Sequence, residues 1–209
     1  MNIYFISIEE IINKFGRDYL RKLYGNYHHY FSRIFLKKIL SEFYNINAEI
    51  SDDNGRPYIK EYSLNFSISH SKNIVAIAFN DNNGSKIGFD IEYIKPRNYN
   101  AVLNYYGVDK PDVTQDEFFQ IWTAYEAEYK SGAGVNKEVK YDVIKNNERY
   151  SDSFYLLSFK YKNYMAALST QVNSEPNLYE IILSDIEDDF ILKEITRVNY
   201  LEPSKVKLK

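Results

Sequence analysis

The sequence repeats one order of predicted secondary structure at a nearly constant spacing. The segment Asn73-Ile-Val-Ala-Ile-Ala-Phe is similar to Asn163-Tyr-Met-Ala-Ala-Leu-Ser, which begins 90 positions later. The predicted helices that precede these segments carry Arg33 and Glu126, which are 93 positions apart. A fixed offset of this kind predicts two similar structural units, with a ligand in the cleft between them. Because a helix followed by a hairpin is a common order, chance similarity without duplication is the alternative.

Hydrophobic periodicity predicts the elements of the first half. Apolar and β-branched residues predict a strand over residues 2–8, and helical spacing predicts helices over about 8–23 and 27–44. Strands are predicted over residues 65–70, 74–79 and 86–94. Asp52-Asp53-Asn54-Gly55 is typical of a turn, and Asn82-Asn83-Gly84 is the hairpin signal before the last of these strands.

The second half follows the same order. A helix is predicted over about residues 114–131, and strands over 154–161, 164–169, 179–183 and 190–198. We therefore expect an α+β fold with an N-terminal lobe over residues 1–85 and a C-terminal lobe over 86–209. Each lobe is expected to pack a small antiparallel sheet against a long helix.

Composition excludes several classes of protein. The chain has no cysteine, which removes disulfides, thiolate metal sites and cysteine nucleophiles. A formal net charge of −3 does not suit a general nucleic-acid binder. Residues 1–8 lack the pattern of a targeting signal, and no apolar run approaches the ~18 residues of a membrane span. We expect a cytoplasmic protein that contacts neither nucleic acid nor membrane.

Two carboxylates share one face of the strand predicted over residues 86–94. Alternation places Asp90 and Glu92 on one side and the strand's isoleucines and phenylalanine on the other. Such a pair is costly unless it is solvated or bridged by a cation, and a hard divalent ion with oxygen ligands is the usual bridge. A second Asp-Ile-Glu at residues 185–187 lies in an acidic stretch typical of a solvated loop. Gly88, which permits close backbone approach, distinguishes the first copy.

A third carboxylate lies in the helix predicted over residues 114–131. Glu126 and Lys130 are four positions apart and share a face with Trp122 one turn earlier. The alternative interpretation is a surface salt bridge on an amphipathic helix.

A metal-dependent nuclease is a further alternative, because Asp90 with Glu128-Tyr129-Lys130 is similar to the Asp…Glu-x-Lys arrangement of restriction-type folds. That arrangement requires Glu-x-Lys on a strand, whereas a helix is predicted here and side chains two apart on a helix diverge. The acidic charge balance also disfavours DNA binding.

His70 is the one histidine that follows an apolar strand, in Phe66-Ser67-Ile68-Ser69-His70-Ser71. A lone histidine at a strand end is more often structural than catalytic. Here the hydroxyls on both sides favour contact with an anion.

Taken in order, these segments resemble the 4′-phosphopantetheinyl transferases, specifically the two-lobed surfactin-synthetase-activating type. Asn54-Gly55-Arg56-Pro57 resembles the family's Asn-Gly-Lys-Pro turn, and the His70 segment resembles its Ser-His-Ser strand end. The stretch from Gly88 to Glu92 resembles its Gly-Ile-Asp-Ile-Glu strand, and the stretch from Trp122 to Lys130 resembles its Trp-Thr-x-Lys-Glu-x-x-x-Lys helix. Arg33 matches an arginine that the family places before the first motif.

The resemblance implies a pseudo-twofold fold and a magnesium-dependent enzyme that moves 4′-phosphopantetheine from coenzyme A to a serine of a carrier protein, releasing 3′,5′-ADP. It implies that Mg²⁺, for which Mn²⁺ could substitute, is held by Asp90, Glu92 and Glu126, with Glu92 acting directly or through water. Glu126 would also accept the serine proton, and Lys130 would bind the pyrophosphate. The adenosine end with its 3′-phosphate would be bound by four residues: Arg33, Arg56, Ser69 and His70.

One departure from the family pattern supports a second function. Tyr125 stands where the family has lysine immediately before the glutamate. The alternative is therefore an impaired relative that binds coenzyme A or a carrier without transfer.

The resemblance also bears on partners. The short stretch between Glu92 and Trp122 corresponds to the family's carrier-binding region, and its Lys95, Arg97 and Lys110 could meet an acidic carrier helix or be ordinary surface charges. A two-lobed chain would form its cleft alone, so we expect a monomer. The carrier's pathway, in fatty acid, polyketide or peptide synthesis, stays open, as does the preference for free or acylated coenzyme A.

Overall fold

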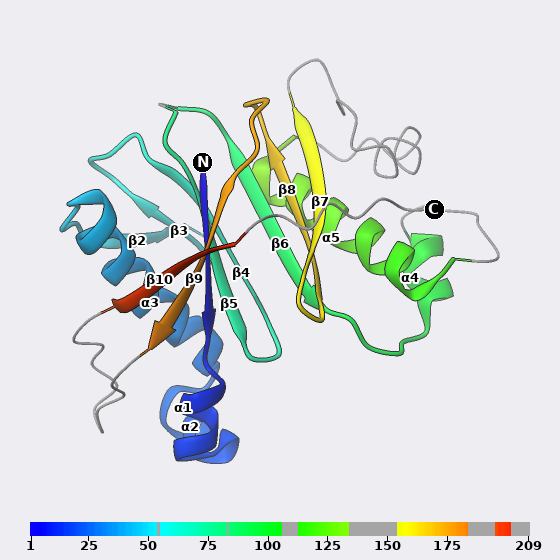
Figure 1. Ribbon diagram of the computed structural model, residues 1–209, viewed down its shortest axis with the longest axis horizontal. Coiled ribbons are helices and arrows are strands. Elements are labelled where there is room, and N and C mark those ends of the chain that lie inside the picture. The colour runs from blue at the N-terminus through cyan, green and yellow to red at the C-terminus, as the bar shows by residue number, and fades with distance from the viewer. Residues whose placement is uncertain (54, 83, 106–112, 134–153, 184–194, 202–209) are drawn as a thin grey trace. The chain divides into compact units, whose positions relative to one another are not determined.

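The chain forms an α+β fold, as predicted, in which runs of helices and runs of strands follow one another (Figure 1). The computed structural model describes residues 1–53, 55–82, 84–105, 113–133, 154–183 and 195–201. The helices are α1 (Glu9–Phe15), α2 (Arg17–Tyr24), α3 (Tyr27–Tyr44), α4 (Tyr99–Tyr105) and α5 (Gln115–Ser131). The strands are β1 (Asn2–Ser7), β2 (Ile50–Asp53), β3 (Arg56–Ile59), β4 (Asn65–Ser71), β5 (Ile74–Asn80), β6 (Ile87–Tyr93), β7 (Tyr155–Tyr161), β8 (Tyr164–Thr170), β9 (Asn177–Leu183) and β10 (Ile195–Leu201).

The chain divides into two compact units. Unit 1 contains Met1–Gly84 together with Pro176–Leu201, and unit 2 contains Ser85–Glu175. The first boundary lies one residue from the predicted one. The second differs from the prediction, which assigned all of residues 86–209 to one lobe. After Glu175 the chain returns to unit 1, because β9 pairs in parallel with β1 from Asn2↔Asn177 to Ile6↔Ile181. An apolar strand pattern does not reveal which sheet the strand will join.

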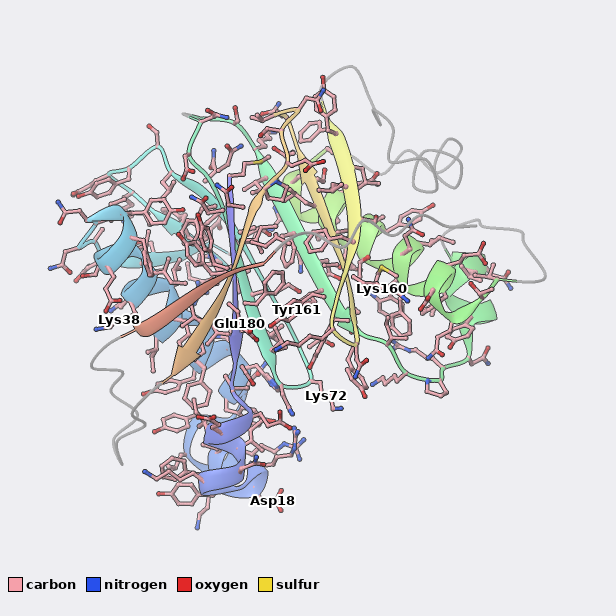
Figure 2. All side chains as sticks on the ribbon, viewed as in Figure 1. Asp18, Lys38, Lys72, Lys160, Tyr161 and Glu180 are labelled. Carbon is pink, nitrogen blue, oxygen red and sulfur yellow. The ribbon has the colours of Figure 1, made fainter. Side chains whose placement is uncertain are left out.

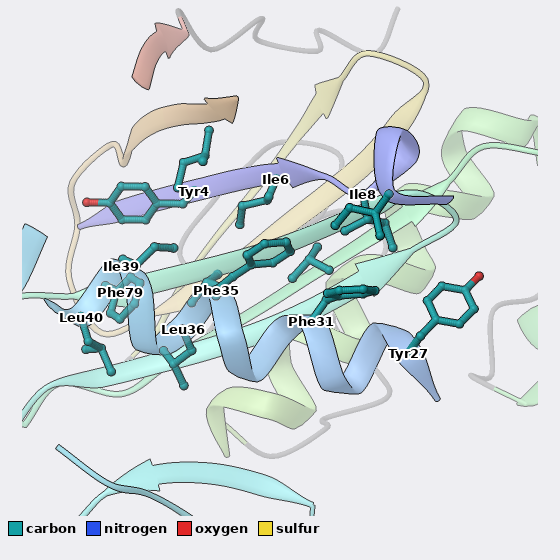
Figure 3. Close-up of a cluster of buried hydrophobic side chains, with 14 of the residues drawn as sticks. Tyr4, Ile6, Ile8, Tyr27, Phe31, Phe35, Leu36, Ile39, Leu40 and Phe79 are labelled. Carbon is teal, nitrogen blue, oxygen red and sulfur yellow. The ribbon is translucent and has the colours of Figure 1, made fainter. Parts of the chain in front are cut away.

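Unit 1 is built on a mixed sheet in the order β10-β9-β1-β5-β4, with β2 and β3 as a separate hairpin. The predicted helix over 27–44 is confirmed as α3, which packs against β5 and β4. Figure 3 shows Phe31, Phe35 and Ile39 pointing from α3 toward the sheet. These side chains are at most 2% exposed and meet Tyr4 and Ile6 of β1 in one hydrophobic cluster. The helical spacing seen in the sequence therefore marks the buried face of α3.

Unit 2 packs α5 across an antiparallel sheet in the order β6-β8-β7. Thr114 caps the helix: its hydroxyl accepts from the Glu117 N–H, and the Glu117 carboxylate accepts from the Thr114 backbone N–H. The contact between α5 and β6 is very close at Gly88. A Cβ added there would lie 1.9 Å from the Ala127 carbonyl oxygen and 2.4 Å from the Ser131 nitrogen. Glycine at this position therefore allows the helix to rest on the backbone of the strand.

The sheets of the two units share part of their strand order. The strand order β1-β5-β4 matches β6-β8-β7, and the bounds of β7 and β8 lie 90 positions after those of β4 and β5. Both hairpins turn through a lysine with φ of 52°, Lys72 in the first, labelled in Figure 2, and Lys162 in the second. These shared features support two copies of one α+β pattern.

Register extends the correspondence to β1 and β6. Tyr4 pairs with Ile77 and Asp90 with Ala167, and these partners are 90 positions apart. By the same offset Ile6 corresponds to Glu92. Two apolar residues of unit 1 thus occupy the positions of two carboxylates in unit 2.

Three local predictions are corrected by the structure. The single helix predicted over 8–23 is two helices, because Gly16 adopts φ of 81° between them. The Asn82-Asn83-Gly84 segment does not close a hairpin, because β5 and β6 belong to different sheets. The turn predicted over residues 52–55 is narrower, because Asp52 and Asp53 belong to β2 and pair with β3, and hydrophobic alternation indicated neither strand. Residues 184–194, which include part of the strand predicted over 190–198, lie outside the described part of the chain.

We predict that Gly88→Ala destabilises the protein by about 3 kcal/mol, because the new methyl group would meet helix backbone that cannot rotate away. Gly84→Ala is the control: Gly84 has φ of 76° but nothing within 4 Å of an added Cβ, so the cost should be only about 1 kcal/mol. Denaturant unfolding measures both. Equal stability losses would show that α5 does not rest on β6 at Gly88.

Candidate active site

The helix-facing side of β6 carries the two predicted strand carboxylates. Because Gly88 faces α5, alternation brings Asp90 and Glu92 to the same side of the strand. Asp90 is buried and Glu92 is half-buried. At the corresponding positions unit 1 places Tyr4 and Ile6 in its core. Carboxylates at core-facing positions break the packing pattern of the fold, and such departures are concentrated at functional sites.

Lys130 of α5 binds the buried carboxylate directly. Its ammonium nitrogen lies 2.7 Å from Asp90 Oδ1 and donates a second hydrogen bond to the Phe89 carbonyl oxygen at 3.2 Å. The Asp90 side chain is 7% exposed and the Lys130 side chain 27%. The interpretation of Lys130 as one end of an exposed helix salt bridge is therefore wrong. Its charge is held at the strand, where it compensates a buried anion.

Glu126 lies on α5 one turn before Lys130 and is half-buried. The helix runs antiparallel to β6. Ala167, which pairs with Asp90, packs with Ala124 and Ala127, whereas Met165, which pairs with Glu92, packs with Ile121 and Tyr125. Lys130 therefore lies at the level of Asp90 along the strand. Glu126, one helical turn earlier, lies closer to the level of Glu92. The four predicted residues of this half, Asp90, Glu92, Glu126 and Lys130, lie on two facing elements.

The carboxylates are not arranged as a preformed metal cage. Within the ranges that the structure describes, no three histidine, aspartate or glutamate side chains are placed to hold a metal ion. One oxygen of Asp90 is bonded to Lys130 instead. The donor chemistry suits Mg²⁺, which prefers carboxylate oxygens and is often held by one or two carboxylates together with substrate phosphates. The three-carboxylate magnesium site stays a prediction.

The Glu-x-Lys pair does not support a nuclease. Glu128 and Lys130 lie on the helix α5, and Glu128 is 1% exposed. Lys130 reaches Asp90 from the helix surface, and Glu128 points into the body of the unit. The strand arrangement on which the nuclease alternative depends is absent from this segment.

Unit 1 carries the other four predicted site residues. Arg33 projects from α3 and forms an ion pair with Asp52 of β2. Arg56 begins β3, opposite Asp53 in the same hairpin, and is exposed. The structure therefore brings both arginines to the β2–β3 hairpin. Asp52 was not predicted as an arginine partner, because the Asp-Asp-Asn-Gly pattern around it indicates only a turn.

Ser69 and His70 alternate along β4. Ser69 is buried and His70 is half-buried. The His70 ring stacks on His28 of α3, with ring centroids 4.9 Å apart, and His28 Nε2 lies 2.7 Å from the Lys72 carbonyl oxygen. His28 was not predicted as a neighbour of His70. Its signal was weak, because it is one of two adjacent histidines at the start of a helix.

Tyr125 is a core residue. It is 2% exposed and packs with Phe118, Phe119 and Met165. Trp122 lies at the edge of the same cluster, and the guanidinium carbon of Arg97 stands 4.2 Å from its ring centroid. Tyr125, which stands where the resemblance leads us to expect a lysine, thus belongs to the packing of unit 2.

Among the described residues, no helix is both long and apolar enough to cross a bilayer.

We predict that His28 makes stability depend on pH. Burial, with the charges of Arg17 and Arg21 adding, lowers the pKa of His28 below its usual 6.5, against the hydrogen bond to Lys72. The unfolded chain then binds the proton more tightly than the folded one, so the stabilisation is complete above about pH 6.5 and falls at lower pH. His28→Phe, which keeps an aromatic ring, should lose less stability than wild type between pH 7.5 and pH 5 in urea unfolding. An unchanged pH dependence would contradict this.

Comparison with known proteins gives a similarity over part of the chain. No protein-family model matches. A Haemophilus influenzae protein, provisionally named a 4′-phosphopantetheinyl transferase, is 35% identical over 95 residues. The match covers 41% of this chain and 40% of that protein, so the chain is compared with less than half of its relative. This similarity supports the 4′-phosphopantetheinyl transferase family in general, without selecting the surfactin-synthetase-activating type.

Proposed function

We propose that the protein transfers the 4′-phosphopantetheine group of coenzyme A to a serine of an acyl or peptidyl carrier protein. The observation that carries the proposal is the placement of Asp90 and Glu92 on the helix-facing side of β6, beside Lys130, where the other unit has core residues. The order of the motifs and the similarity to the Haemophilus influenzae protein support the same reaction.

The proposed role of the β6–α5 face is to bind the pyrophosphate of coenzyme A. Asp90, Glu92 and Glu126 are the proposed ligands of Mg²⁺, or of Mn²⁺ in its place. A bound ion would neutralise charge on the phosphate under attack. Lys130 is the second cation of the site. Because it holds Asp90 in this structure, pyrophosphate oxygens would draw its ammonium away from the carboxylate as the ligand enters.

Glu126 is the proposed general base. Its carboxylate accepts the proton of the carrier serine, directly or through a water molecule, as the serine oxygen attacks the β-phosphate. The new bond is serine oxygen to phosphorus. The bond that breaks joins the β-phosphorus to the bridging oxygen, and the electron pair leaves with 3′,5′-ADP. The half-buried position of Glu126 limits its hydration without removing access to a substrate hydroxyl.

Unit 1 is proposed to bind the adenosine end of coenzyme A through Arg33, Arg56, Ser69 and His70. Its support is the position of the two arginines at one hairpin and the half-buried imidazole of His70. Both arginines are permanent cations, which suits the 3′-phosphate.

The carrier is proposed to be recognised by its acidic surface. Lys95 is exposed, whereas Arg97 lies over the Trp122 ring and Lys110 falls outside the described residues. We further propose a cytoplasmic monomer, since the chain carries all the residues assigned to the site. Direct assay decides whether free or acylated coenzyme A is preferred and which pathway supplies the carrier.

The second candidate function is binding of coenzyme A or a carrier without transfer, and Tyr125 is the residue that favours it. Incubation of the protein with several apo-carriers, coenzyme A and Mg²⁺, followed by mass spectrometry of the carrier, separates the two. A mass gain of one phosphopantetheine group supports transfer. No gain with any carrier favours the binding protein.

We predict that Asp90→Asn and Glu126→Gln each lower the transfer rate by at least about 100-fold, because each removes a charge at the reacting phosphate. Asp116→Asn is the matched control. Asp116 lies on the same helix but pairs with Lys160 at the surface, so its loss should change the rate by less than about twofold. Carrier mass against time gives the rates, and circular dichroism checks folding. Wild-type rates in either site variant would refute the assignment.

A further prediction concerns Tyr125. Tyr125→Lys should destabilise unit 2 by several kcal/mol, about 2–5, because an ammonium group would enter an apolar cluster. Tyr125→Phe, which keeps the ring, is the control. If the thermal unfolding temperature of the lysine variant matches that of wild type, position 125 faces solvent or the site. The absence of a lysine there would then have to be tested for its effect on the transfer rate.

A further inference from the structure

A pocket in unit 1 runs along one side of α3 and has a volume of about 520 Å³. His29, Arg33 and Lys37 follow one another at four-residue intervals and form a basic row on the helix. Asn26, Tyr30 and Ile34 form a second row beside it. Tyr24 also lines the pocket, and its ring stacks on Tyr30 with centroids 4.0 Å apart. One side of the pocket therefore suits an anion and the other an aromatic or apolar group.

Arg33 is the central cation of this pocket, and its hydrogen bonding is incomplete. One guanidinium nitrogen, Nη2, pairs with Asp52 Oδ2 and lies 3.5 Å from His29 Nε2. The other nitrogen, Nη1, is buried and has no hydrogen-bond partner among the described residues. A buried donor without a partner is unfavourable, so a ligand that binds both nitrogens would gain from satisfying Nη1.

Asp52 cannot easily supply that second bond. Its other oxygen, Oδ1, accepts the Gly55 backbone N–H at 2.6 Å, which fixes the carboxylate in the turn of the β2–β3 hairpin. The carboxylate thus meets the guanidinium at one point only, and its side chain is 47% exposed. A partly exposed, single-point ion pair contributes little, whereas a phosphate can bind an arginine through two parallel hydrogen bonds.

We propose that Asp52 is an internal competitor for the phosphate of a phosphorylated nucleoside that binds the α3 pocket. The carboxylate occupies Arg33 while the pocket is empty of phosphate. A phosphate monoester replaces it, engages both Arg33 nitrogens and lies within the basic row that includes Lys37. Asp52 thereby sets how tightly the ligand is held and favours groups that carry a full phosphate.

The inference rests on the proposed function only in the choice of ligand. Among phosphorylated nucleosides we select adenosine 3′,5′-bisphosphate, the part of coenzyme A that would leave after transfer. Binding of this compound needs no transfer reaction. A failed titration and a failed transfer assay are therefore separate results.

The test is calorimetric titration of the full chain with adenosine 3′,5′-bisphosphate. Asp52→Asn should tighten binding by about fivefold or more, because the amide removes the competing charge and its oxygen can still accept from Gly55. Asp18→Asn is the matched control: this aspartate of α2 lies in the same unit and is exposed, and its substitution removes the same charge. It should change the affinity by less than about twofold.

Two further arms make the result specific. In an Arg33→Ala background, Asp52→Asn should no longer tighten binding, because the two residues act on the same phosphate. Adenosine without phosphate should bind the wild type and Asp52→Asn equally. The proposal is overturned if Asp52→Asn binds the bisphosphate no better than wild type, or if adenosine gains equally. Weaker binding by this variant would show instead that Asp52 positions Arg33 for the ligand.

Discussion

The close contact between α5 and β6 at Gly88 is the constraint on which the candidate site depends. No other residue type could occupy this position without displacing the helix backbone. Because the two backbones approach so closely, Lys130 can reach both Asp90 and the Phe89 carbonyl oxygen. The Ser131 and Ser169 hydroxyls, 3.0 Å apart, join the same helix to β8. Backbone packing thus determines the position of the charges.

The two units show how one pattern serves packing in one place and chemistry in another. Tyr4 and Ile6 of β1 complete an apolar core with α3, whereas Asp90 and Glu92 occupy the corresponding register of β6. Placing a carboxylate there costs solvation, and Lys130 offsets part of that cost. Unit 2 retains apolar packing farther along α5, where Phe118, Phe119 and Met165 cluster. The Asp90–Lys130 pair therefore lies near the C-terminal end of α5, away from this cluster.

The parts of this arrangement that follow from local periodicity could be predicted. Alternation was sufficient to predict that Asp90 and Glu92 lie on the same side of β6. Helical spacing was sufficient to predict that Glu126 and Lys130 share a face of α5 and to predict the first and last residues of α3. Features that depend on tertiary partners could not. Nothing in the residues 177–183 indicates β1 as their neighbour, and the link between Arg33 and Asp52 joins a helix to a hairpin whose strands lack a hydrophobic pattern. Gly16 was visible in the sequence, but a glycine within an amphipathic stretch is often tolerated without a break.

The parallel pairing of β1 with β9 has a consequence for synthesis of the chain. β1 is made first, yet one of its edges stays open until residues 177–183 have been made. During that interval a strand containing Ile3, Phe5 and Ile6 presents unpaired backbone groups, which is a template for association with other chains. The last described residue of unit 2, Glu175, precedes β9, so the sheet β6-β8-β7 is made before the sheet of unit 1 can be completed. A chain that terminated before residue 177 would therefore contain all the strands of unit 2 but would leave one edge of β1 without its partner.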